Sequence, residues 1–183
     1  MHRLIVLAGF QSVWFVSVIC AAYALYWPGP VIVILWLLLY AWRSGSMKQE
    51  LTLGLISGAI GFFVDTAFIW SEAFIPEGIY GSLRLSPPWM IGLWLNFATS
   101  LNSLFYWLKG RYLLAAFLGF FGGPAAYYSG ASLGAAVINH SFAYNLVLIG
   151  LGWSISLPLL IWLSEKIRPV ISTNKPLAGG RKT

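Results

Sequence analysis

Charged residues are scarce in this chain. They make up 9% of its 183 residues, with five acidic and eleven basic side chains, whereas a soluble domain carries about 25%. A fold surrounded by water would lack the polar side chains needed to cover its surface. The scarcity therefore argues against a water-soluble globular domain and indicates that lipid covers much of the exterior.

Cysteine and histidine are also nearly absent. Cys20 is the single cysteine, so the chain forms no internal disulfide, and the two histidines are His2 and His140. No stretch matches a phosphate-binding loop, a dinucleotide fingerprint or a cluster of metal ligands. We therefore predict neither a metal site nor a cofactor.

Apolar runs are abundant, because 59% of the residues are hydrophobic. About 20 apolar residues in a helix cross the ~30 Å hydrocarbon core of a bilayer. Six runs are candidate spans, covering residues 4–26, 31–42, 51–70, 88–108, 112–129 and 142–163. We predict one all-α transmembrane helical bundle of about six spans over residues 1–168. A disordered basic tail is predicted over residues 169–183.

The basic residues indicate an orientation. If the N-terminus is cytoplasmic, ten of the eleven Lys and Arg residues fall on the inner side and only Arg84 falls outside. Cytoplasmic segments of membrane proteins are enriched in these residues. We therefore predict that both termini are cytoplasmic and that the basic charge reflects topology rather than nucleic-acid binding. The first run also resembles a signal peptide, but its length favours an uncleaved span.

Polar side chains gather on one side of the fourth predicted span. At about 3.6 residues per turn, Asn96, Thr99, Ser100 and Ser103 share one side, and apolar residues occupy the other. In lipid, the polar side faces other helices or an internal space. Two interpretations stay open, namely hydrogen bonding between packed helices and a polar-lined pocket.

The third predicted span carries the only acidic residue within the six runs. Gly54, Gly58, Gly61 and Asp65 are spaced by four, three and four residues, so they lie on one helical face. Small residues at this spacing let a second helix approach closely, which predicts that Asp65 lies in a packed seam. A carboxyl group within a span is costly and marks a candidate functional site. A structural, hydrogen-bonded aspartate is the alternative.

The fifth predicted span contains Gly122-Gly123-Pro124 near its middle. Proline removes a backbone donor and clashes with the preceding turn. We therefore predict a helix break at Gly122, Gly123 and Pro124, as in the interrupted helices that bind ligands in some transporters. A kink that merely packs against its neighbours is the alternative.

Residues 130–134 read GASLG, a formal match to the G-x-S-x-G motif. Ser132, His140 and Asp65 would supply a nucleophile, a base and an acid, and they are the candidate catalytic residues. The motif normally lies where a strand turns into a helix, whereas this stretch is apolar and helical in pattern.

Four stretches together resemble a bacterial family of inner-membrane proteins catalogued as domain of unknown function 2878. They are FQSVWFVSV (10–18), GFFVD (61–65), PPWMIGLWLNFATSLNSLFYWL (87–108) and GGPAAYYSGASLGAA (122–136). The resemblance implies a small multi-pass protein of a Gram-negative inner membrane, associated with genes for modification of membrane fatty acids. It also implies a basic residue where Ser132 stands, which argues against a serine hydrolase.

We predict that the protein is no enzyme but binds a lipid or small apolar molecule, as an accessory to membrane lipid modification. Membrane lipid and other membrane proteins are the predicted partners. The predicted cavity is lined by Asp65, Asn96, Thr99, Ser100, Ser103 and Tyr127. One alternative is a small-solute or proton-coupled transporter in which Asp65 titrates. A second is a lipid-modifying enzyme that uses Ser132 or Asp65 with His140.

Overall fold

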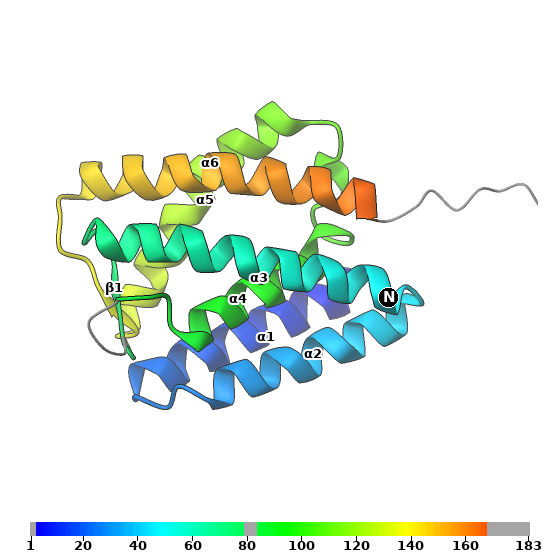
Figure 1. The fold of residues 1–183 in the computed structure, drawn as a ribbon, viewed down its shortest axis with the longest axis horizontal. Coiled ribbons are helices and arrows are strands. Elements are labelled where there is room, and N and C mark those ends of the chain that lie inside the picture. The colour runs from blue at the N-terminus through cyan, green and yellow to red at the C-terminus, as the bar shows by residue number, and fades with distance from the viewer. Residues whose placement is uncertain (1–2, 79–83, 168–183) are drawn as a thin grey trace, which may run out of the picture.

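The computed structural model describes residues 3–78 and 84–167. Within these residues the chain is helical, as predicted. The α-helices are α1 (Arg3–Ala22), α2 (Pro28–Ser44), α3 (Met47–Trp70), α4 (Pro88–Leu101), α5 (Tyr112–Ser132) and α6 (Phe142–Ile167). They run back and forth between two ends of one bundle, and α5 crosses α6 (Figure 1). The predicted tail over 169–183 lies outside the described residues.

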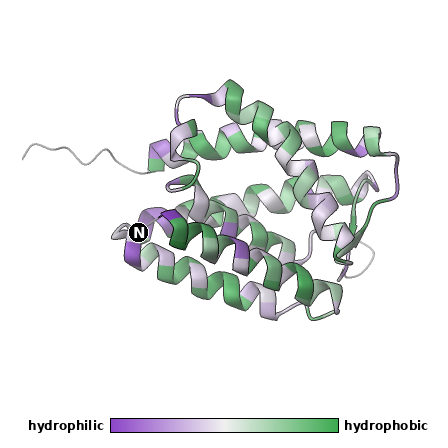
Figure 2. Ribbon diagram, turned by 180° about the vertical axis from the view of Figure 1, so that it is seen from behind, coloured by the Kyte–Doolittle hydropathy of each residue, from purple (hydrophilic) through white to green (hydrophobic). Residues whose placement is uncertain are grey.

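Three of the described helices are long and apolar enough to cross a membrane, namely α1, α3 and α6. Helix α2 is apolar but shorter, at 17 residues. The exterior of the helices is also apolar. For example, Leu55, Phe63, Leu113 and Ile155 are 68%, 70%, 90% and 69% exposed, and hydrophobic residues dominate the helices in Figure 2. An apolar exterior of this extent indicates a surface that is covered by something other than water.

Basic residues gather at one end of the bundle. The start of α1, the turn between α2 and α3, and the end of α6 all lie there (Figure 1). The segment between α4 and α5 joins this end through Glu165, which accepts hydrogen bonds from Gly110 N at 3.0 Å and from the Tyr112 hydroxyl at 2.9 Å. The segments that carry the basic residues, on which the predicted orientation rests, therefore lie together at one end of the bundle. The assignment of this end to the cytoplasm stays a prediction.

Helix α4 ends earlier than predicted, at Leu101 rather than Leu108. Its 14 residues span about 21 Å, which is shorter than a bilayer core. Asn and Ser side chains compete with the helical backbone for hydrogen bonds. Here the Asn102 amide turns to Glu50, and the Ser103 hydroxyl donates back to Thr99 O at 3.0 Å. A 3₁₀ turn over Tyr106–Leu108 follows in place of the predicted last two helical turns.

The predicted break at Gly122, Gly123 and Pro124 is wrong, because α5 continues through Pro124 to Ser132. Proline at 124 removes the N–H that would bond the carbonyl of Phe120. That carbonyl faces Gly150 of α6, where a Cβ would lie 2.7 Å from the oxygen. Helix α5 packs extensively against α6, and it continues past the missing hydrogen bond to Ser132.

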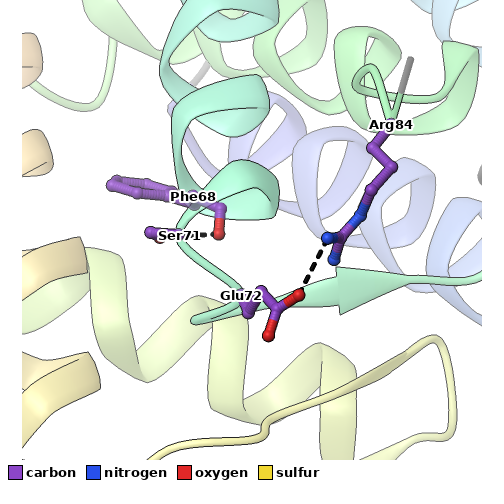
Figure 3. Close-up of polar contacts among 4 residues, drawn as sticks. All are labelled: Phe68, Ser71, Glu72 and Arg84. Carbon is purple, nitrogen blue, oxygen red and sulfur yellow. Dashed lines mark hydrogen bonds and ion pairs between the residues drawn. The ribbon is translucent and has the colours of Figure 1, made fainter. Parts of the chain in front are cut away.

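Two short strands tie the opposite end of the bundle together. β1 (Ile75–Pro76) pairs antiparallel with β2 (Ala136–Val137). The turn that leads into β1 is held by Ser71 Oγ, which donates to Phe68 O at 2.8 Å, and by an ion pair between Arg84 and Glu72 at 2.9 Å (Figure 3). This end therefore has a fixed cover made of the segments after α3 and after α5.

Candidate functional site: an apolar cavity beside Asp65

A cavity of about 410 Å³ lies among α1, α4, α5 and α6. Its wall is apolar and rich in aromatic rings, and Asp65 is the one Asp, Glu, Lys, Arg or His side chain among the described lining residues. The lining residues are Phe10, Trp14, Val18, Asp65, Phe74, Trp89, Met90, Leu93, Trp94, Phe97, Phe105, Leu118, Gly119, Gly122, Gly123, Ala126, Tyr127, Gly130, Trp153 and Leu157. Helices α1 and α5 form facing walls and are not among the helix pairs that pack extensively on each other.

Small residues on one side of α5 create the space. Gly119, Gly122, Gly123, Ala126 and Gly130 all face the cavity. A Cβ added at Gly122 or Gly130 would meet no atom within 4 Å. The wall contributed by α1 consists instead of large side chains such as Trp14. The open space at Gly122 and Gly130, together with the lack of extensive packing between α1 and α5, therefore accounts for the cavity.

Asp65 is buried, with 1% of its surface exposed, and both of its carboxyl oxygens accept hydrogen bonds. Tyr127 donates its hydroxyl proton to Oδ1, and Trp94 donates its indole N–H to Oδ2 at 3.0 Å. Buried polar groups in native proteins are satisfied in this way. Helices α3, α4 and α5 thus meet at one carboxyl group in the cavity wall.

The glycine seam of α3 explains why Trp94 reaches Asp65. A Cβ at Gly61 would overlap the indole ring of Trp94, and a Cβ at Gly58 would overlap Leu95. The predicted close approach at these glycines is confirmed, and so is the burial of Asp65 on the same face. Because Gly61 lies one turn before Asp65, the indole that fills its place is positioned to donate to the carboxyl group.

Contacts between aromatic rings hold both donors of Asp65 in place. The Trp94 ring stacks on Trp153 of α6 at 4.5 Å between centroids with an interplanar angle of 16°. Tyr127 makes edge contacts with Phe68 and Phe74, at 5.7 and 4.9 Å between centroids. Such pairs add about 0.5–1.5 kcal/mol each beyond area burial. The Asp65 donors are therefore held by packing as well as by their hydrogen bonds.

Of the six predicted ligand-binding residues, the structure brings only Asp65 and Tyr127 to the cavity. The other four lie on another side of α4 or beyond its end and bond elsewhere. Asn96 donates to Phe10 O of α1 at 3.0 Å, and Thr99 accepts from Trp36 of α2 at 3.2 Å. Ser100 and Ser103 donate to backbone carbonyls of the preceding turn. These four residues therefore fit the first of the two interpretations, hydrogen bonding within and between packed helices, rather than a polar-lined pocket.

Hydrogen bonding does not bring the candidate catalytic residues together. The exposed Ser132 donates to Tyr128 O at 2.8 Å, and the exposed His140 packs on the Tyr144 ring at 4.6 Å. The Asp65 carboxyl group instead accepts hydrogen bonds from Trp94 and Tyr127. Among residues 3–78 and 84–167, no group of three His, Cys, Asp or Glu side chains is placed to hold a metal ion.

Sequence reasoning missed a second buried carboxyl group. Glu50 lies in the first turn of α3 and is 1% exposed. Asn102 donates to both of its oxygens, at 3.2 and 3.3 Å, and accepts from Lys109 at 3.0 Å. Glu50 directly precedes the third apolar run, so in the sequence it resembled a water-exposed charge at the end of a span. The start of α3 at Met47 places it inside the helix instead.

A protein-family profile described as "Protein of unknown function (DUF2878)" matches residues 3–159. No curated protein and no solved structure matches the chain. The matched range contains every residue that lines the cavity. The resemblance seen in the four stretches of sequence is thereby confirmed over most of the chain, and the protein belongs to the DUF2878 family.

Proposed function

We propose that this protein lies in the bacterial inner membrane and binds a lipid chain or small apolar molecule in the cavity between α1 and α5. The observation that carries the proposal is the cavity itself, with its apolar wall and its one carboxyl group. Its volume of about 410 Å³ falls within the ~300–1,000 Å³ of small-molecule sites, which are mostly apolar with few polar groups. A cavity of this size suits one chain rather than a whole two-chain lipid.

The proposed location rests on three observations. Three described helices are long and apolar enough to cross a bilayer, exposed side chains along the helices are apolar, and basic residues gather at one end. Under the positive-inside rule this end lies in the cytoplasm. We propose further that the protein acts as an accessory to lipid modification, with other membrane proteins as partners.

Proton-coupled transport is a second candidate, and the observation in its favour is that Asp65 lies in the cavity wall. In that case, liposomes containing the protein would show a pH-dependent solute flux that Asp65→Asn abolishes. Binding without transport predicts no such flux.

Filling the cavity tests the binding function. Leucine at Gly122 would project into the cavity, since no atom lies within 4 Å of its Cβ position. Ala125→Leu is the matched control, because Ala125 is an exposed residue of the same helix that does not line the cavity. Native mass spectrometry of the protein released from nanodiscs would measure bound lipid or small molecules.

We expect a retained molecule on the wild type and on Ala125→Leu, and its loss from Gly122→Leu with unchanged helix content by circular dichroism. Equal retention by Gly122→Leu and the wild type would contradict binding in this cavity. Absence of any retained molecule from the wild type would also count against it.

A further inference from the structure

Aromatic rings are concentrated in the wall of the cavity. Phe, Trp and Tyr make up 17% of the chain, but they account for nine of the twenty residues that line the cavity. These nine are Phe10, Trp14, Phe74, Trp89, Trp94, Phe97, Phe105, Tyr127 and Trp153. Leu, Ile, Val and Met would make an equally apolar wall, and methionine adapts readily to irregular shapes. The excess of rings therefore indicates an occupant that rings recognise.

The rings contact one another in a continuous series. Phe97 of α4 contacts Phe10 of α1 at 6.3 Å between ring centroids and Trp153 of α6 at 5.3 Å. Trp153 in turn contacts Tyr127 of α5 at 6.5 Å, and Tyr127 contacts Phe74 at 4.9 Å. Favourable ring pairs have separations of about 4.5–7 Å. The wall is therefore a connected aromatic surface in which each ring restricts the rotation of its neighbours.

The two facing helices give the cavity a similar length on both sides. On α1, Phe10, Trp14 and Val18 line the cavity and recur every four residues, so they lie on one face over about 12 Å. On α5, the open positions Gly122 and Gly130 are eight residues apart, again about 12 Å along the helix. Because glycine has no side chain, an occupant can approach the backbone of α5 closely at these positions.

Such a space favours a flat and rigid occupant. A conjugated molecule can stack on, or meet the edges of, the aromatic rings of the wall. Its flat face can also lie against the bare backbone of α5 at Gly122 and Gly130. A saturated chain lacks the ring contacts, and binding would fix its many rotatable bonds at an entropic cost that a rigid molecule avoids.

We propose, resting on the binding function above, that the occupant is a planar conjugated molecule, such as a polyene or an aromatic ring with an apolar tail, rather than a saturated acyl chain. The aromatic residues of the wall, Phe10 of α1 among them, are then specificity-determining residues. They act by contact alone, and no covalent step is involved.

Competition between two uncharged isoprenoid alcohols with the same number of carbon atoms tests this proposal. All-trans-retinol is conjugated and nearly flat, whereas phytol is almost fully saturated and flexible. Both are added at equal mole fraction to nanodiscs that contain the protein, and native mass spectrometry measures which alcohol stays bound. On the wild type we expect at least about tenfold more bound retinol than phytol, because several rings contribute to its binding. Circular dichroism in the retinol absorption band should appear as the site fixes the polyene.

Phe10→Leu removes one ring from the wall and keeps it apolar. We expect the ratio of bound retinol to bound phytol to fall by about two- to tenfold, while bound phytol stays within about twofold. Phe63→Leu is the matched control, because it makes the same change at a residue of α3 that is 70% exposed and does not line the cavity. This control should leave the ratio unchanged. Gly122→Leu should abolish the binding of both alcohols.

The outcomes separate the two proposals. Retention of neither alcohol by the wild type, or retention that Gly122→Leu leaves unchanged, would overturn both the binding function and the planar occupant. Phytol bound as well as retinol, and lost from Gly122→Leu, would overturn only the planar occupant. A ratio that Phe10→Leu leaves at the wild-type value would overturn recognition by the rings. Because the wild type alone gives the comparison of the two alcohols, the test stands even if a variant fails to fold.

Discussion

Alanine at Gly150 and alanine at Gly122 should have opposite effects on stability. Gly150 of α6 lies against the backbone of α5, where a new Cβ would be 2.7 Å from Phe120 O, whereas ordinary contacts begin near 3.4 Å. A backbone carbonyl cannot rotate away, so α5 and α6 must move apart by several tenths of an ångström. At Gly122 the new Cβ meets no atom within 4 Å.

The magnitude follows from the comparison of the two variants. Both gain the same helix propensity, about 1 kcal/mol for replacing Gly by Ala, so this contribution cancels between them. Overpacking of a close contact costs about 1–3 kcal/mol. We therefore expect Gly150→Ala to be less stable than Gly122→Ala by about 1–3 kcal/mol, with Gly122→Ala equal to or above the wild type.

Unfolding in mixed micelles by titration with sodium dodecyl sulfate, followed by tryptophan fluorescence and circular dichroism, measures this difference. Gly130→Ala serves as a further control, because its Cβ position is also open. If Gly150→Ala unfolds at the same detergent fraction as Gly122→Ala, the close approach of α5 and α6 is not a determinant of stability, and the steric argument fails.

Three further predictions concern buried polar groups and topology. Tyr127→Phe removes the hydroxyl donor of a buried carboxyl group and should lower the free energy of unfolding by about 1–3 kcal/mol in the same titration; an unchanged titration would refute this. Asn102→Ala removes the amide that donates to both oxygens of Glu50, and a loss of about 1–3 kcal/mol is expected by the same measurement. Single cysteines replacing Lys109 and His140 in a cysteine-free background should react differently with a membrane-impermeant maleimide. The His140 site should label in cells with a permeabilised outer membrane, and the Lys109 site only after the inner membrane is broken; the reverse pattern would invert the topology.

The sequence predicted the helical architecture and the seam of α3 because both follow from local periodicity. Gly54, Gly58 and Gly61 recur at helical spacing, and the buried face that they share with Asp65 depends on nothing beyond one helix. Apolar runs likewise predict helices wherever water is excluded, because every backbone group must then bond within its own segment. These features need no knowledge of which helices are neighbours.

The errors arose where a neighbouring helix decides the outcome. Pro124 lies within a continuous helix that packs along α6, where the released carbonyl of Phe120 lies against Gly150. The end of α4 depends on the attraction of the Asn102 amide to Glu50, which lies 52 positions earlier in the chain. Neither contact leaves a periodic signal in the sequence.

The sequence predicted two residues of the site, Asp65 and Tyr127, but not the cavity wall around them. The burial of Asp65 was expected and Tyr127 was placed with it in the predicted cavity, but the second donor, Trp94, was not among the predicted residues. The chain has ten tryptophans, and nothing in their spacing singles out the one that reaches Asp65. The cavity depends on glycines of α5 facing aromatic residues of α1, and that pairing is a property of the tertiary fold alone.

The paired strands β1 and β2 have a consequence for how the cavity exchanges its contents. They cover one end of the bundle, and Phe74, directly before β1, forms part of the cavity wall. Helices α1 and α5 do not pack extensively on each other, so an approach between them would lead sideways into the hydrocarbon of the proposed membrane. Occupancy would then follow the mole fraction of the occupant in the leaflet rather than its aqueous concentration. Washing with buffer would leave the bound molecule in place, whereas dilution with excess detergent would strip it.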